Sequence, residues 1–156
     1  MTTRSHRLAK HIQRTVTGPM WHGAALGPLL DGITEAQASA RPIPGAHTIW
    51  EIVLHVTAWA DIARARVHGE RLGDPSSEED WPPPGAGADA WRRAVEQLTA
   101  SHNVLAAVVR PLTDAALDAK VRSLDYPVGI LLDGVVEHGT YHGGQIALLR
   151  KALGVS

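Results

Sequence analysis

Two histidines near the end of the chain have a spacing that suits metal binding. His138 and His142 lie four residues apart, which on a helix puts both imidazoles on one face with about 5–6 Å between their Cβ atoms. Two neutral imidazoles in this arrangement can share one divalent metal ion and leave further positions open for other ligands. The alternative is a pair of core histidines with ordinary hydrogen bonds. Nine histidines in 156 residues give on the order of half such a pair by chance, so spacing alone does not decide.

A third ligand for the same ion would have to come from another helix. His55 lies three residues after Ile52, on the inner edge of an amphipathic segment, and is the first candidate. His102 is the competitor, because it also falls on an inward apolar stripe. Burial favours a metal ion over isolated core histidines, because adjacent buried imidazoles need polar partners and one ion serves both. His22 and His47 fall near expected helix ends or loops, where their side chains could line a cavity.

Other catalytic and metal-binding motifs do not occur in the sequence. It has no Glu-x-x-His pair of the di-iron bundle type, no His-Glu-x-x-His, no P-loop and no Gly-x-Ser-x-Gly. The chain contains no cysteine, so it can form no disulfide, thiolate metal site or cysteine nucleophile. Any thiol that takes part in its chemistry must therefore come from a second molecule.

The composition is typical of a folded domain. Its 156 residues are 44% hydrophobic, which is enough to build a core, and we expect a single domain over residues 1–156. The net charge is −1 and no basic run occurs, so neither nucleic acid nor an anionic membrane is an expected partner. Residues 1–14 lack the apolar stretch of a secretory signal, and no window approaches the roughly 20 apolar residues of a membrane span. We therefore expect a cytoplasmic protein.

Helical periodicity occurs in four regions, and no region shows sustained strand alternation. The first region spans about residues 4–31 and should break or kink at Gly18-Pro19. The second begins at Thr48, where Thr48 and Glu51 fit a capping box. It continues as a helix about 30 Å long that carries His55.

The other two helices are expected later in the chain. Asp89 is a plausible N-cap for the third, which should end before Pro111. Pro127 suits the first turn of the fourth, which should run to about Leu153 and carries the histidine pair. The inward residues of this last helix are expected to be Ile130, Leu131, Val135, Ile146 and Leu149.

A long connection joins the second helix to the third. Residues 69–87 are polar and interrupted by several prolines, and connections of this length are often functional or cross one end of a bundle. The predicted fold is therefore an all-α four-helix bundle with a long crossover loop and a broken N-terminal helix.

Over about residues 21–151 the sequence resembles the DinB/YfiT-like metal-binding four-helix bundles. The most specific element is His-x-x-x-His-x-Gly-Gln at 138–145, combined with an earlier helical histidine. The remaining residues that carry the resemblance are the segment 42–55, Trp59, Trp81-Pro82, Trp91, Glu137, Tyr141 and Ile146.

The resemblance implies which histidines bind the metal. In that family, one histidine of the second helix and two of the last helix bind one divalent ion, which here corresponds to His55, His138 and His142. His102 is not a ligand in that pattern and is expected in the core. The family also implies a homodimer, and the small residues Gly134, Gly139 and Gly143 would permit close helix contact or simply relieve crowding within the bundle.

Two functions remain open. The first is a metal-dependent enzyme, either a transferase or isomerase that uses a small external thiol, or a hydrolase. Zinc or nickel would suit the three imidazoles best, and iron or manganese would also be accepted. Gln145, Tyr141 and Trp59 could shape its pocket, although packing and helix-surface roles are the better explanation for each of them individually. Glu51 could be a hydrogen-bond acceptor for His55 instead of only a cap.

The second function is a non-catalytic metal-binding protein of the stress response. A fourth protein ligand from His22 or His102 would favour it, because structural metal sites usually have four protein ligands. Three ligands with an open position favour the enzyme.

Overall fold

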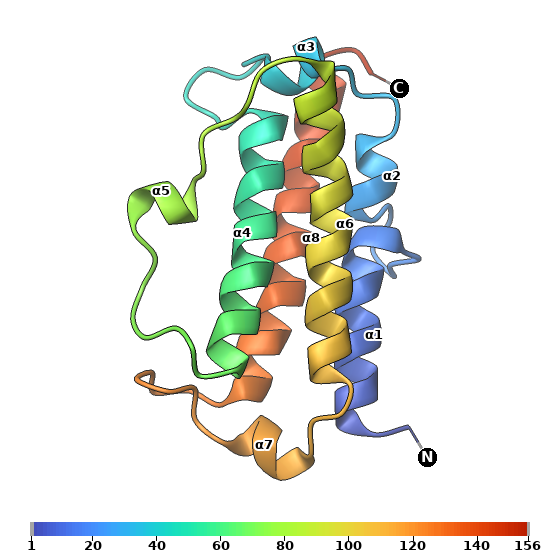
Figure 1. Ribbon diagram of the computed structural model, residues 1–156. Coiled ribbons are helices and arrows are strands. Elements are labelled where there is room, and N and C mark those ends of the chain that lie inside the picture. The colour runs from blue at the N-terminus through green and yellow to red at the C-terminus, as the bar shows by residue number, and fades with distance from the viewer. Residues whose placement is uncertain (1, 156) are drawn as a thin grey trace.

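Four long helices form the body of the molecule (Figure 1). The computed structural model describes residues 2–155, and within this range every regular element is a helix. The bundle helices are α1 (Arg4–Thr17), α4 (Ile49–Val67), α6 (Ala88–Val109) and α8 (Val128–Ala152). Four short helices lie in the connections: α2 (Leu26–Leu30), α3 (Glu35–Ser39), α5 (Ser77–Asp80) and α7 (Asp114–Asp118). The expected all-α four-helix bundle is confirmed. None of the described helices is long and apolar enough to cross a membrane.

The order of the helices in space makes α4 and α8 neighbours. Helices α1 and α4 each pack against both α6 and α8, so α1 lies diagonally across the bundle from α4. Helices α1 and α8 run in one direction and α4 and α6 in the other, because the long crossover returns the chain to the end where α4 began (Figure 1). The two helices that carry the predicted metal ligands therefore lie side by side and antiparallel.

The start of α4 is fixed by the predicted capping box. The Thr48 hydroxyl oxygen accepts a hydrogen bond from the Glu51 amide at 3.1 Å, and a Glu51 carboxylate oxygen accepts one from the Thr48 amide at 2.8 Å. These bonds satisfy two amides that the helix itself leaves unpaired. They also fix where His55 lies along the helix.

The N-terminal region is broken where Gly18-Pro19 predicted a break. Helix α1 ends at Thr17, and Gly18 has a positive φ of 74° that a helix cannot continue through. The chain becomes helical again only in α2.

Two details of the predicted elements are wrong. Helix α6 begins at Ala88, with Gly87 as its N-cap and no side-chain cap, because the positive φ of Gly87 turns the chain into the helix earlier than Asp89. Asp89 lies in the first turn instead, where its charge suits the helix dipole. On α8, Ile130 is 57% exposed and not inward, because it lies on the same face of the helix as the exposed Leu148, about five turns later.

The crossover contains a short helix that the sequence pattern did not show. The Ser76 hydroxyl and the Glu79 carboxylate form a second capping box at the start of α5. The Arg71 guanidinium donates two hydrogen bonds to the Glu79 carboxylate, at 2.9 and 3.0 Å. The crossover is therefore held in a defined conformation against the outside of α4.

The buried apolar residues form two clusters, with a polar layer between them. Along α8, one cluster ends at Val135 and the other begins at Ile146. Along α4, Val56 belongs to one cluster and Ala60 to the other. The histidine pair of α8 lies in the gap between the clusters, where buried polar groups must find partners.

Close packing of α8 against α1 depends on Gly139. A Cβ atom on Gly139 would lie 2.3 Å from Cγ2 of the buried Thr15, while one on Gly143 would make ordinary contacts of 3.6 and 3.7 Å with side chains of α2. Gly139 therefore permits close packing of α8 against α1, whereas α2 leaves room for a side chain at Gly143.

We expect Gly139→Ala to destabilise the protein by about 1–3 kcal/mol, because the added methyl group overpacks the contact with Thr15. Gly144→Ala is the matched control on the same helix, since a Cβ there meets nothing within 4 Å. It should stabilise the protein by up to about 1 kcal/mol through helix propensity. Urea unfolding measures both, and equal stability of the two variants would contradict the packing role of Gly139.

Candidate metal centre

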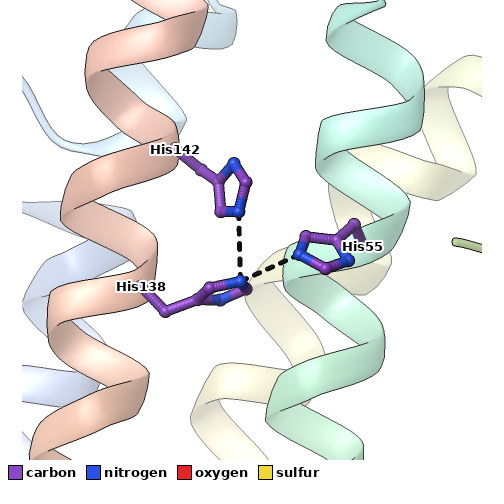
Figure 2. Close-up of side chains that lie close together, drawn as sticks. All are labelled: His55, His138 and His142. Atoms are coloured by element: carbon purple, nitrogen blue, oxygen red, sulfur yellow. Dashed lines mark hydrogen bonds between the residues drawn. The ribbon is translucent and has the colours of Figure 1, made fainter. Parts of the chain in front are cut away.

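The three predicted ligands converge between α4 and α8 (Figure 2). Nε2 of His138 lies 2.9 Å from Nε2 of His55 and 3.1 Å from Nε2 of His142. One potential ligand atom from each of the three histidines lies within 4.8 Å of the others. His55 and His142 are buried, and His138 is half-buried. Two antiparallel helices thus place three imidazoles around one point.

The outer nitrogens of two of these rings are held by oxygen atoms. Nδ1 of His55 lies 2.6 Å from the backbone oxygen of Asp80, and Nδ1 of His142 lies 2.7 Å from Oε1 of Gln145. An oxygen acceptor requires an N–H donor, so both rings carry their hydrogen on Nδ1 when neutral. Their Nε2 lone pairs then face the common centre, which is the arrangement that orients metal-binding histidines.

A cation at this centre would give every one of the three Nε2 atoms a favourable partner. Nε2 of His138 can donate a hydrogen bond to His55 or to His142, but each neutral imidazole has only one N–H. At least one of the two short contacts is then left without a proper hydrogen bond. Tetrahedral Zn–N bonds of about 2.0–2.1 Å place nitrogens about 3.3 Å apart, so a small outward movement makes room for an ion. The three-histidine group could therefore hold a metal ion.

All three imidazoles are kept neutral by their surroundings. Burial lowers the pKa of His138 to about 3, with a further contribution from the neighbouring His142 and His55. Burial also lowers the pKa of His55 and of His142, and in each case the hydrogen bond at Nδ1 opposes this effect only in part. Neutral imidazole is the form that binds metal, so protons compete little with an ion near pH 7.

The crossover supplies residues of the site that the sequence did not reveal. The indole of Trp81 lies stacked between two imidazoles, with ring centroids 3.8 Å from His55 and 3.6 Å from His47. The Asp80 carboxylate accepts a hydrogen bond of 2.6 Å from the indole nitrogen of Trp59. Trp81-Pro82 marked this segment, but no pattern marked Asp80, which holds His55 through its backbone oxygen.

Four further residues were predicted near the site, and the structure shows that only some of them contact it. Gln145 contacts His142, and Trp59 lines the adjacent cavity. Tyr141 is 64% exposed, with its ring 5.0 Å from that of His142. Glu51 accepts hydrogen bonds from the Thr48 amide and the Arg41 guanidinium, and also contacts His47. The acceptor for His55 is therefore Asp80 and not Glu51.

His102 lies in the core, as the resemblance implied. It is 1% exposed, and its Nδ1 lies 2.8 Å from the backbone oxygen of Leu98. It does not belong to the three-histidine group, although it is near enough to contribute to the lowered pKa of His138. His22, the other possible fourth ligand, is exposed.

A cavity of about 510 Å³ opens beside the three histidines, in the size range of small-molecule sites. It extends between α4 and α8 under the crossover. Its lining residues are His55, Trp59, Arg66, Asp74, Asp80, Tyr126, Ile130, Leu131, Gly134, Val135 and His138. The predicted ligands thus meet at one end of a space that could hold a small molecule.

We expect the metal-free protein to lose stability as the pH falls from about 6.5 to 4. The pKa of His138 is about 3 in the folded chain against 6.5 ordinarily, so in this range the unfolded chain binds more protons. Above about pH 6.5 this contribution is constant. Urea unfolding at a series of pH values measures the effect, and His138→Gln should show a shallower fall. Parallel curves for the two proteins would contradict it.

A comparison with known protein families agrees with this architecture. The family model of the DinB superfamily matches residues 20–146, which include the whole of α4 and both histidines of the last helix. No curated protein matches the sequence. The chain belongs to the DinB superfamily.

Proposed function

We propose that this protein is a metal-dependent enzyme in which His55, His138 and His142 hold one divalent ion. Zinc or nickel suits three imidazoles best, and iron or manganese is also compatible with them. One observation carries the proposal: the Nε2 atoms converge at 2.9 and 3.1 Å while oxygen atoms hold Nδ1 of His55 and of His142. Fixing the outer nitrogen in this way is a feature of metal sites.

The ligand number favours a catalytic ion over a structural one. Within residues 2–155, no fourth histidine, aspartate or glutamate joins the group, and structural sites usually have four protein ligands. A bound ion with an open position would lower the pKa of a coordinated water or thiol. Asp80 and Gln145 would keep the imidazoles oriented, and the indoles of Trp59 and Trp81 would limit the access of water.

Two classes of reaction are compatible with an open metal site beside this cavity. Because the sequence contains no cysteine, a thiol-dependent transfer or isomerisation would use a small external thiol. Hydrolysis with a metal-activated water is the second possibility within the same class of site. The cavity of about 510 Å³ beside His138 is large enough for a small substrate next to the ion.

Elemental analysis of the untagged protein tests the ligand set. We expect about one divalent ion per chain, loss of this ion in His142→Ala and its retention in His102→Ala. The second variant is the control, because His102 is a buried histidine outside the group. Unchanged metal content in His142→Ala would refute the ligand set, and loss of the ion in His102→Ala would show that α6 supplies a ligand.

The hydrogen bond from His142 to Gln145 can be tested separately. Gln145→Leu should keep one ion per chain but weaken its binding about 10- to 100-fold, because the imidazole is no longer held in one tautomer and orientation. Competition with a chelating indicator measures the affinity. Gly144→Ala changes the preceding residue, whose Cβ would meet nothing within 4 Å, and should leave the affinity unchanged. Equal affinities for the Leu variant and the unmodified protein would exclude this role of Gln145.

A further inference from the structure

The cavity beside the histidines has a charged group among its other lining residues. Arg66 of α4 lines it and is only 3% exposed. A guanidinium stays charged even when buried, so its surroundings must provide hydrogen-bond acceptors or negative charge. The proposed metal chemistry makes no use of Arg66.

The guanidinium of Arg66 is incompletely paired. Its Nη1 donates to the Tyr126 hydroxyl at 3.3 Å, and its Nη2 donates to the Gly73 backbone oxygen at 3.1 Å. Nε is buried and has no hydrogen-bond partner within the described residues. The paired carboxylate belongs to Asp74, at 3.3 Å and with its side chain 89% exposed. Charge-assisted bonds are usually about 2.7–2.9 Å, so this contact is long and can be replaced.

A single indole separates this cation from the histidines. The ring of Trp59 lies 5.5 Å from Cζ of Arg66 and 5.9 Å from the ring of His138, measured to ring centroids. The remaining wall of the cavity is mostly apolar, with Ile130, Leu131 and Val135 contributed by α8. The cavity thus has an apolar middle, an imidazole group and a separate guanidinium.

We propose that Arg66 binds the carboxylate of a small substrate whose apolar body lies along Trp59 and whose reacting end reaches the three histidines. The assignment of the reacting end rests on the proposed function, whereas the carboxylate site does not. The Tyr126 hydroxyl is placed to donate a hydrogen bond to the same carboxylate. When no ligand is bound, the guanidinium donates to Asp74 instead.

The charges around the cavity favour a carboxylate over a phosphate. Asp74 and Asp80 both line it, and a dianionic phosphate would be repelled by them more strongly than a monoanion. One guanidinium with one hydroxyl matches the two oxygens of a carboxylate, which arginine binds through paired N–H donors. Asp80 accepts a hydrogen bond from Trp59, whereas Asp74 is the carboxylate paired with Arg66, so Asp74 is the group that a ligand would displace.

A matched acid and amide test this site by calorimetry on the full chain. We expect the metal-loaded protein to bind 3-phenylpropanoate about tenfold or more tightly than 3-phenylpropanamide, because only the acid forms charge-assisted bonds. Arg66→Gln should remove this preference, because the acid loses its charge-assisted bonds. Asp74→Asn should strengthen binding of the acid alone, because it removes the competing carboxylate. Equal binding of acid and amide by the unmodified protein would overturn the proposal.

Two controls separate this site from the metal centre and from a purely structural role of Arg66. A carboxylate can also bind a metal ion, so binding of the acid and of the amide is measured again on metal-free His142→Ala. His142 does not line the cavity, so this change leaves the cavity wall intact. Preference for the acid should persist in this variant, and its loss would overturn the proposal.

If Arg66→Gln does not fold, binding of the acid to Asp74→Asn is the deciding measurement, because this exposed residue can be changed without disturbing the core. Unchanged acid binding in Asp74→Asn would overturn the proposal.

Discussion

The hydrogen bond between His55 Nδ1 and the backbone oxygen of Asp80 connects the bundle with the crossover, and the site depends on it. Its length of 2.6 Å fixes the imidazole with Nε2 toward α8. It also places the following residue, Trp81, face to face with the same ring. The antiparallel neighbour α8 supplies the other two imidazoles one helical turn apart. Without this bond, the His55 ring could turn and the three Nε2 atoms would no longer share one centre.

The helical layout and the histidine pair of α8 could be predicted from the sequence, because both follow from local periodicity. Spacing along α8 put His138 and His142 on one face, and the capping box at Thr48 fixed the start of the helix that carries His55. The choice between His55 and His102 needed the family resemblance, since an inward stripe does not tell which helices are neighbours. In the structure α8 packs against α4 and lies across the bundle from α6.

The parts of the site that the sequence did not show are those that act through backbone or through long-range contacts. Asp80 holds His55 with a main-chain oxygen, which any residue possesses, so its side chain gave no signal. Glu51 was a plausible partner for His55 by helical spacing, but Arg41 and His47 from the preceding loop occupy its carboxylate. Ile130 was counted among the inward residues, but it lies about five helical turns before the exposed Leu148 and therefore on the same outer face of α8.

The residues around the cavity differ in how completely their polar groups are satisfied. At the metal centre, the outer nitrogens of His55 and His142 have oxygen partners, so the rings are prepared for an ion. At Arg66, a buried nitrogen has no partner among the residues that the structure describes, and the paired carboxylate is largely exposed. A buried cation with such weak compensation lowers the stability of the folded chain. A role in ligand binding explains why this group faces a cavity, since a purely structural arginine would be better paired within the bundle.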